Sequence, residues 1–227
     1  MHPEILRTKN FVRDAVALIE RAADTAIFER GQFRIGLSGG NTPRLIYEEL
    51  AGKQDAWDDW VFTFGDERCV PPDDVQSNYR MVRETLFDGT PIPPRNVIRM
   101  RGEDDPAKAA ADYEAELRKR AGSAPMYRHD ILLLGMGDDG HTASLFPGTT
   151  ALDETSRWVV SNFVPKFNAH RITLTYPVIN AARHVVFLVK SSGKEEMLEK
   201  VFSGKWDFPC NRVRPVEGNL TWLLGEE

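Results

Sequence analysis

The sequence contains no apolar run of the roughly 20 residues that a membrane-spanning helix needs, so it predicts no transmembrane segment. Its first residues, MHPEILRTKNF, have neither the apolar stretch nor the small-residue cleavage site of a secretory signal. Cysteine is scarce as well, since only Cys69 and Cys210 are present and they form no C-x-x-C motif. This pattern is more typical of a reducing compartment than of a disulfide scaffold, and we expect a cytoplasmic protein.

An excess of positive charge is also missing, because 29 Lys and Arg face 34 Asp and Glu and give a net charge of −5. This composition provides no electrostatic basis for binding nucleic acid. An anionic small molecule would instead require a local cluster of Arg or Lys beside a glycine-rich loop. We predict a single domain over residues 1–227, a small-molecule substrate, and a monomer or weak homodimer.

Helical and extended patterns alternate along the chain. The expected strands are residues 33–37, 60–64, 96–100, 130–134, 158–162, 171–175, 185–190 and 219–224, the last at a sheet edge. The expected helices are residues 11–28, 42–50, 78–87, 106–120 and 194–202. The apolar segment DILLL at 130–134 is typical of a strand buried on both faces of a parallel sheet. We therefore predict an α/β fold with one doubly wound, mostly parallel sheet, helices on both faces, and ligands at the carboxyl ends of the strands.

The segment GLSGG at 36–40 matches the G-x-S-x-G motif of serine hydrolases. That motif starts its helix at the serine, whereas Thr42 and Pro43 predict an N-cap and a first helical residue about four positions later. We favour a cradle for phosphate or hydroxyl groups over a tight turn that binds nothing, because glycines and a helix N-terminus suit an anion. The residues assigned to this cradle are Ser38, Gly39, Gly40, Asn41 and Thr42.

A second glycine-rich segment, GMGDDG at 135–140, matches the dinucleotide motif G-x-G-x-x-G. Asp138 and Asp139 would repel a pyrophosphate there, and Arg157 lies where that motif needs an acidic residue, so a nicotinamide cofactor is not expected. No P-loop motif is present. His141 has no second His or Cys at metal-ligand spacing, and we predict no metal, with a site near the two aspartates as an open alternative.

His141 lies after the buried strand expected at 130–134, between two glycine turns. We predict that it is the acid/base of the site. A short helix expected at 142–146 would place the imidazole at a helix N-terminus, whose positive potential favours the neutral ring. Asp139, two residues earlier, could accept the other ring N–H and fix the tautomer. A helix-capping role is the alternative for this histidine.

Charged residues at the ends of other predicted strands complete the candidate site. The strand at 60–64 runs into Asp66, Glu67 and Arg68, and Asp66 is the third residue that we assign to catalysis. Arg68, Arg171 and Lys194 form the candidate anion clamp, since the arginine fork matches phosphate and carboxylate. Solvated surface charges are the alternative interpretation of both groups.

Several segments in order along nearly the whole chain resemble the 6-phosphogluconolactonase family: GLSGGNTP, FTFGDERCVP with SNYRM, LLLGMGDDGHTASLFP and RITLTYPVINAARHVVFLV. The resemblance implies a Rossmann-like sheet and the hydrolysis of 6-phosphoglucono-1,5-lactone to 6-phosphogluconate in the oxidative pentose phosphate pathway, without a cofactor. It also implies that His141 activates water, that Arg171 and Lys194 bind the phosphate, and that Arg68 contacts the substrate.

Two alternatives remain. The related glucosamine-6-phosphate deaminases/isomerases carry a third carboxylate shortly after the DGH motif, where this chain has Phe146. A sugar-phosphate sensing domain of a transcription regulator would have a helix-turn-helix ahead of the sheet, and here one helix without basic character precedes the first expected strand.

Overall fold

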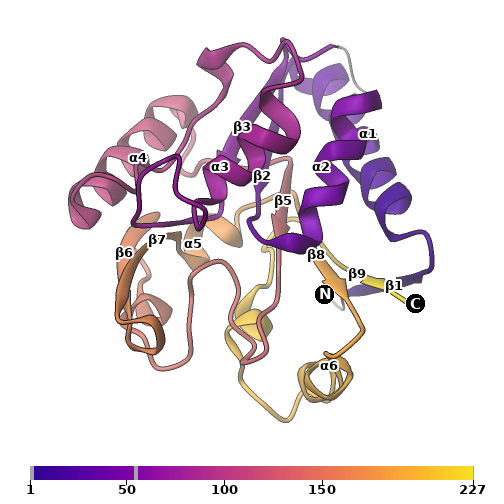
Figure 1. The fold of residues 1–227 in the computed structure, drawn as a ribbon, viewed down its shortest axis with the longest axis vertical. Coiled ribbons are helices and arrows are strands. Elements are labelled where there is room, and N and C mark those ends of the chain that lie inside the picture. The colour runs from indigo at the N-terminus through magenta and orange to yellow at the C-terminus, as the bar shows by residue number, and fades with distance from the viewer. Residues whose placement is uncertain (1–2, 54–55, 227) are drawn as a thin grey trace.

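A parallel six-stranded sheet forms the centre of the computed structural model, which describes residues 3–53 and 56–226 (Figure 1). Its strand order is β1-β9-β8-β5-β2-β3. The strands are β1 (Glu4–Thr8), β2 (Phe33–Leu37), β3 (Trp60–Phe64), β5 (Ile131–Leu134), β8 (His184–Lys190) and β9 (Asn219–Gly225). Every neighbouring pair in this order runs parallel, which confirms the predicted α/β class.

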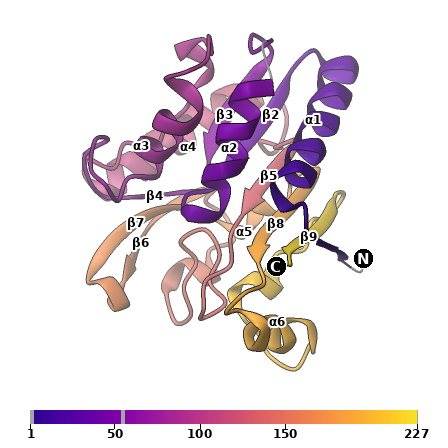
Figure 2. The same ribbon diagram turned by 45° about the vertical axis from the view of Figure 1, so that its right-hand side comes forward.

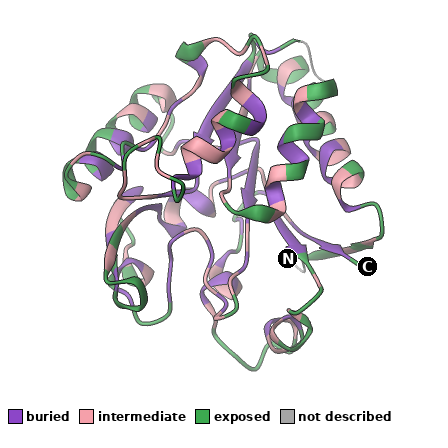
Figure 3. Cartoon of the chain, in the orientation of Figure 1, coloured by how far each residue is buried: buried purple, intermediate pink, exposed green. Residues whose placement is uncertain are grey.

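Helices cover both faces of this sheet, as expected (Figure 2). The helices α1 (Phe11–Arg30), α2 (Asn41–Lys53) and α3 (Asn78–Val82) pack on one face. The helices α4 (Pro106–Ala121), α5 (Tyr176–Ile179) and α6 (Glu195–Phe202) pack on the other. Because side chains alternate along a strand, Ile131 and Leu133 of β5 enter the first core and Leu132 and Leu134 the second. The central strand is therefore buried throughout (Figure 3).

A second sheet was not expected. The antiparallel strands β4 (Asp66–Arg68), β7 (Ala169–Leu174) and β6 (Val159–Val164) form it in that order. The predicted strands at 158–162 and 171–175 exist, but their assignment to the parallel sheet is wrong. The physical reason is the connection between them, a turn over Pro165–Phe167 and Asn168, which is long enough for a hairpin and too short for a parallel crossover.

Other differences lie at proline-rich and edge segments. The strand expected at 96–100 is absent, and a 3₁₀ turn over Pro94–Asn96 leads to a single bridge between Phe62 and Val97. Adjacent prolines at 93 and 94 fix φ at about −65° and favour this turn, which takes Asn96 out of the expected strand. The helix expected at 78–87 continues beyond α3 as a π-helix over Arg83–Phe87. The strand β1 was missed, so β9 lies inside the sheet instead of at its edge.

A buried carboxylate, that of Glu67, joins β4 to the N-terminus of α3. Its two oxygens accept hydrogen bonds from the backbone N–H groups of Arg68 (2.7 Å), Asn78 (2.7 Å) and Tyr79 (2.8 Å) and from the Ser77 hydroxyl (3.1 Å). Only 2% of Glu67 is exposed, and burial raises its pKa even though these donors act in the opposite direction. The first turn of α3 and the end of β4 are therefore held together by one side chain.

Replacing Glu67 by Gln should lower the free energy of unfolding by about 2 kcal/mol, because the amide NH₂ would face backbone donors that then lose their acceptor. Urea denaturation of the wild type and the variant measures this loss. Glu84→Gln is the matched control, since Glu84 pairs with Arg80 at the surface and exposed ion pairs contribute little. Equal effects of the two changes would contradict the structural role of Glu67.

A second buried titratable group, His129, lies just before β5. The Thr63 hydroxyl donates to the Ile35 carbonyl (3.0 Å), so it accepts the hydrogen bond from Nε2 of His129 (2.9 Å). Nδ1 then carries a lone pair and has no partner among the described residues. Burial, helped by the charge of Arg34, lowers the pKa of His129 to about 3. The imidazole is therefore neutral in the fold.

This depressed pKa links stability to pH. The unfolded chain binds a proton at His129 below about 6.5 and the folded chain does so only below about 3. The contribution of this residue is therefore complete above pH 6.5 and is lost as the pH falls. Between pH 4 and 6 the wild type should lose stability more steeply than His129→Gln, by about 1.4 kcal/mol per pH unit. Parallel slopes in urea denaturation across this range would refute the assignment.

Candidate active site

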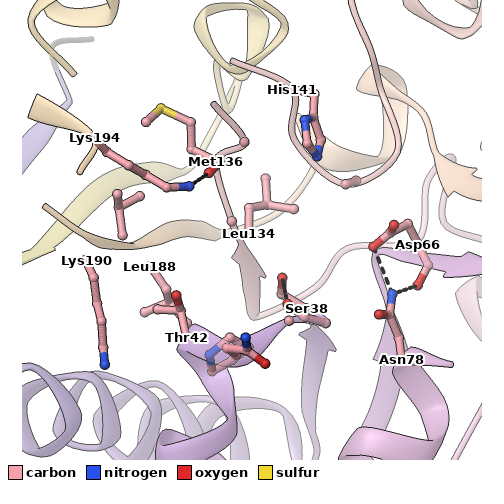
Figure 4. Close-up of a pocket in the computed structure, with 18 of the residues that line it drawn as sticks. Ser38, Thr42, Asp66, Asn78, Leu134, Met136, His141, Leu188, Lys190 and Lys194 are labelled. Carbon is pink, nitrogen blue, oxygen red and sulfur yellow. Dashed lines mark hydrogen bonds between the residues drawn. The ribbon is translucent and has the colours of Figure 1, made fainter. Parts of the chain in front are cut away.

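A cavity of about 440 Å³ opens where the loops after four neighbouring strands meet. These strands, β8, β5, β2 and β3, run parallel, so their carboxyl ends lie at one edge of the sheet. The side chains of His141 and Lys194 reach into it from one side, opposite Ser38 and Thr42 (Figure 4). Most of the candidate residues line this cavity, whereas Asp139 and Arg171 are not among its lining residues.

His141 and Asp139 form a close pair at this cavity. Nδ1 of His141 lies 2.5 Å from Oδ1 of Asp139, which also accepts the backbone N–H of His141 at 3.2 Å. Burial alone would raise the pKa of Asp139, but the hydrogen bond and charge of His141, together with Lys166, hold it at about 2. The carboxylate is ionised and accepts a hydrogen bond from Nδ1–H, so the neutral ring carries its free lone pair on Nε2.

The imidazole is also held by packing. The Phe146 ring stacks on it with centroids 3.9 Å apart and an interplanar angle of 22°. A Cβ atom at Gly137 would lie 2.0 Å from Nδ1, so only glycine fits at that position. The backbone N–H of Gly137 donates to the carbonyl of His141 at 2.9 Å. The ring is therefore fixed from one face and from its Nδ1 edge.

The helix expected at 142–146 does not form. This segment is a tight turn with a bridge between Thr142 and Leu145, and Ala143 has a positive φ of 46°. The prediction that a helix N-terminus keeps His141 neutral is therefore wrong. A non-glycine residue with positive φ interrupts helical geometry, and the Thr142 hydroxyl instead donates to the carbonyl of Gly135 at 2.9 Å.

The loop after β2 forms the opposite wall. The helix α2 begins at Asn41, one residue earlier than the predicted cap, and Gly40 with φ of 97° makes the turn into it. Tyr47 Oη accepts the N–H of Ser38 (3.0 Å) and donates to its carbonyl (2.9 Å). The Ser38 hydroxyl donates to the Gly39 carbonyl at 3.3 Å, and no hydrogen bond joins it to His141 within the described part of the chain. The serine-nucleophile alternative therefore has no support from this geometry.

Asp66 lies at the edge of the cavity with both carboxylate oxygens engaged. Oδ2 accepts the Ser144 hydroxyl at 2.6 Å, and Oδ1 accepts Nδ2 of Asn78 at 3.3 Å. Nδ2 also donates to the Asp66 carbonyl at 2.9 Å. A Cβ at Gly39 would meet Oδ1 of Asn78 at 1.8 Å, so the glycine lets the two loops touch. Asn78 lines the cavity and was not among the candidates, although the SNYRM segment that contains it had been noted.

The three basic candidates differ in position. Lys194 and Arg68 line the cavity. The Lys194 ammonium donates to the carbonyl of Met136 and lies 3.5 Å from Oδ1 of Asp138. Arg171 is not among the lining residues and is paired with Arg68 across the β4–β7 ladder, where burial and then the charge of Arg68 lower its pKa. Lys190, exposed at the end of β8, lines the cavity and was missed because nothing in an ordinary strand end distinguishes it.

Neither a metal-ligand cluster nor a membrane-spanning helix occurs within residues 3–53 and 56–226. No group of three or more His, Cys, Asp or Glu is placed to hold a metal ion there. No helix in the same residues combines the length and the apolar character needed to cross a bilayer. Asp138 and Asp139 instead contact Lys194 and Lys166.

Comparison with known proteins matches nearly the whole chain to one protein family. The model of the family described as glucosamine-6-phosphate isomerases/6-phosphogluconolactonase matches residues 7–222. The chain is 42% identical to the 6-phosphogluconolactonase of Nostoc sp., over 96% of this chain and 95% of that protein. It is 37% identical to the human 6-phosphogluconolactonase, over 93% and 85%.

Solved structures agree. The crystal structure of 6-phosphogluconolactonase from Thermotoga maritima matches with a TM-score of 0.89 at 30% identity, covering 99% of this chain and all of that one. The 6-phosphogluconolactonase from Trypanosoma cruzi matches with a TM-score of 0.90 at 29% identity, over 99% and 94%. The likeness extends over the parallel sheet and all four loops of the cavity.

Proposed function

The chain belongs to the glucosamine-6-phosphate isomerase/6-phosphogluconolactonase family, and we propose that it hydrolyses 6-phosphoglucono-1,5-lactone to 6-phosphogluconate in the oxidative pentose phosphate pathway. The observation that carries this proposal is the pair of His141 and Asp139 at a cavity that Lys194 also lines. We also propose that the enzyme works in the cytoplasm, a reducing compartment that suits its two free thiols. We propose further that it is a single domain and a monomer or weak homodimer.

The reaction needs one base that can return its proton. Nε2 of His141 takes a proton from water as the oxygen attacks the lactone carbonyl carbon, which gives a tetrahedral oxyanion. Collapse of the oxyanion breaks the bond to the ring oxygen, and the imidazolium returns its proton to that oxygen. Asp139 stabilises the imidazolium between the two transfers, because its low pKa keeps it ionised throughout.

The remote phosphate supplies binding energy that orients the ring. The helix α2 begins at Asn41, and its N-terminus favours an anion. We assign the phosphate to the backbone N–H groups at this end, those of Gly39, Gly40, Asn41 and Thr42. Lys194 faces this loop across the cavity and adds a positive charge (Figure 4). Arg68, with Arg171 beside it, is proposed to contact the substrate at the other end of the site.

Asp66 was assigned to catalysis, and its contacts favour a positioning role within the site. Both of its carboxylate oxygens already accept hydrogen bonds from Ser144 and Asn78. The first bond joins β4 to the loop after β5 that carries His141, and the second joins β4 to the start of α3. Asp66 therefore keeps the cavity in shape and leaves proton transfer to the histidine.

His141→Asn should lower turnover at least about 100-fold, because the amide has no basic nitrogen to accept a proton from water. Affinity for 6-phosphogluconate should change little, since the phosphate contacts remain. An assay coupled to glucose-6-phosphate oxidation, corrected for spontaneous lactone hydrolysis, measures the turnover. His170→Asn is the control, as this histidine is exposed on β7. Near-normal turnover in His141→Asn would overturn the mechanism.

The deaminase/isomerase alternative depends on a carboxylate where this chain has Phe146. That position is filled by an apolar ring packed flat on His141, so it offers no group for ring opening of an amino sugar. We expect no release of ammonia from glucosamine 6-phosphate above the background without enzyme. Ammonia formation at a rate comparable to lactone hydrolysis would favour the alternative.

Binding of a sugar phosphate without any hydrolysis would favour the sensing-domain alternative. The hydrogen-bonded pair of His141 and Asp139 argues against it, because binding alone needs no oriented base. A thermal shift with 6-phosphogluconate, measured together with the lactonase rate, separates the two functions.

A further inference from the structure

The tip of the β6–β7 hairpin reaches the His141–Asp139 pair. The strands end in a turn at Pro165–Phe167, closed by Asn168 in the left-handed region with φ of 47° and by its N–H bonding to the Pro165 carbonyl at 3.0 Å. This fold-back places Lys166 and Phe167 against the loop after β5. The hairpin belongs to the smaller sheet, so this contact joins the two sheets at the site.

Lys166 makes the first of two contacts with this loop. Its ammonium lies 3.0 Å from Oδ2 of Asp139, the oxygen that His141 does not use. The carboxylate thus bridges a cation and the imidazole, one on each oxygen. The Asp139 side chain is 29% exposed and that of Lys166 is 58% exposed, so solvent reaches this ion pair.

Phe167 makes the second contact. Its ring meets Phe146 edge-to-face with centroids 5.7 Å apart, and Phe146 in turn stacks on His141. The Lys166 ammonium lies 5.7 Å from the centre of the same Phe167 ring. The apolar contact and the ion pair therefore come from adjacent residues and act on the two neighbours of one imidazole.

We propose that Lys166 is a positioning residue for the lactonase reaction, acting on His141 through the Asp139 carboxylate. It holds that carboxylate in the orientation that accepts the Nδ1 proton. Its positive charge also balances the ionised Asp139 carboxylate that the imidazole contacts. The inference rests on the proposed function, because it assigns a role in the same reaction.

Other charged groups near His141 come from several elements. Asp138 and Asp139 share its loop. Asp66 and Arg68 on β4 and Lys194 before α6 line the same cavity, and Arg171 on β7 lies in register with Arg68. Asp138 is 3.5 Å from Lys194, and Asp66 is bonded to Ser144 and Asn78. Among the described residues, Lys166 is the cation that pairs with the carboxylate bound to His141.

Lys166→Met tests the proposal, with Lys166→Arg as the conservative variant and Lys108→Met as the control. Lys108 forms an exposed ion pair with Asp112 on α4, so its loss removes a comparable surface charge. Lys166→Met should lower kcat about fivefold with KM nearly unchanged, in line with a partly exposed ion pair. Lys166→Arg should recover most of the lost kcat, because it restores a cation beside Asp139.

A double-mutant cycle shows whether Lys166 acts through Asp139. In an Asp139→Asn background, Lys166→Met should have no further effect on kcat, because the carboxylate that it acts on is gone. Additive losses would mean that Lys166 contacts the substrate directly and would overturn the positioning role. Unchanged kcat in Lys166→Met would overturn it as well.

The tautomer of the His141 ring separates this inference from the proposed function. In ring ¹⁵N spectra, with His141 assigned by loss of its signal in His141→Asn, the wild type should show the Nδ1–H tautomer and Lys166→Met a mixture of tautomers, because the carboxylate is no longer held against Nδ1. This result does not require turnover. An inactive wild type would refute the proposed function, while an unchanged tautomer in Lys166→Met would refute the role of Lys166.

Discussion

The parallel alignment of β8, β5, β2 and β3 is the constraint on which the rest of the molecule depends. Four neighbouring strands with one direction bring four loops to one edge, and each loop then needs only one or two polar residues to build a site. The alternating burial of β5 fixes this arrangement, because a slip of one residue would exchange the side chains of the two cores. His141 can therefore reside on an irregular loop and still be placed reproducibly.

Local sequence patterns predict much of this arrangement. The apolar runs at 33–37 and 60–64 became β2 and β3 with the predicted bounds, and α3 begins at the predicted residue, where Ser77 caps it by accepting the N–H of Arg80 at 3.1 Å. The site loops could be predicted because polar and glycine residues follow buried strands directly. The pairing partners could not, since β6 and β7 have the same period as any half-buried strand and only the short turn between them dictates a separate antiparallel sheet.

Site residues whose contacts lie far away in the sequence could not be predicted, for a related reason. Asn78, Lys166 and Lys190 are common polar residues in segments without a distinguishing pattern. Asn78 and Lys166 contact residues 12 and 27 positions away, and Lys190 lies at the end of a strand. The helix expected after His141 failed because Ala143 adopts a left-handed backbone, which no propensity of that segment indicates. Electrostatic control of the histidine then comes from a shared carboxylate instead of a helix dipole.

The Tyr47 hydroxyl has a consequence for how a phosphate is recognised. Because it takes both the N–H and the carbonyl of Ser38, the first amide of the loop is already saturated and cannot face a ligand. Burial raises the pKa of the Tyr47 phenol above its ordinary value, so the hydroxyl stays uncharged and keeps both hydrogen bonds. In the proposed phosphate cradle, the amides that follow Ser38 at the start of α2 are therefore the ones left to bind an oxyanion.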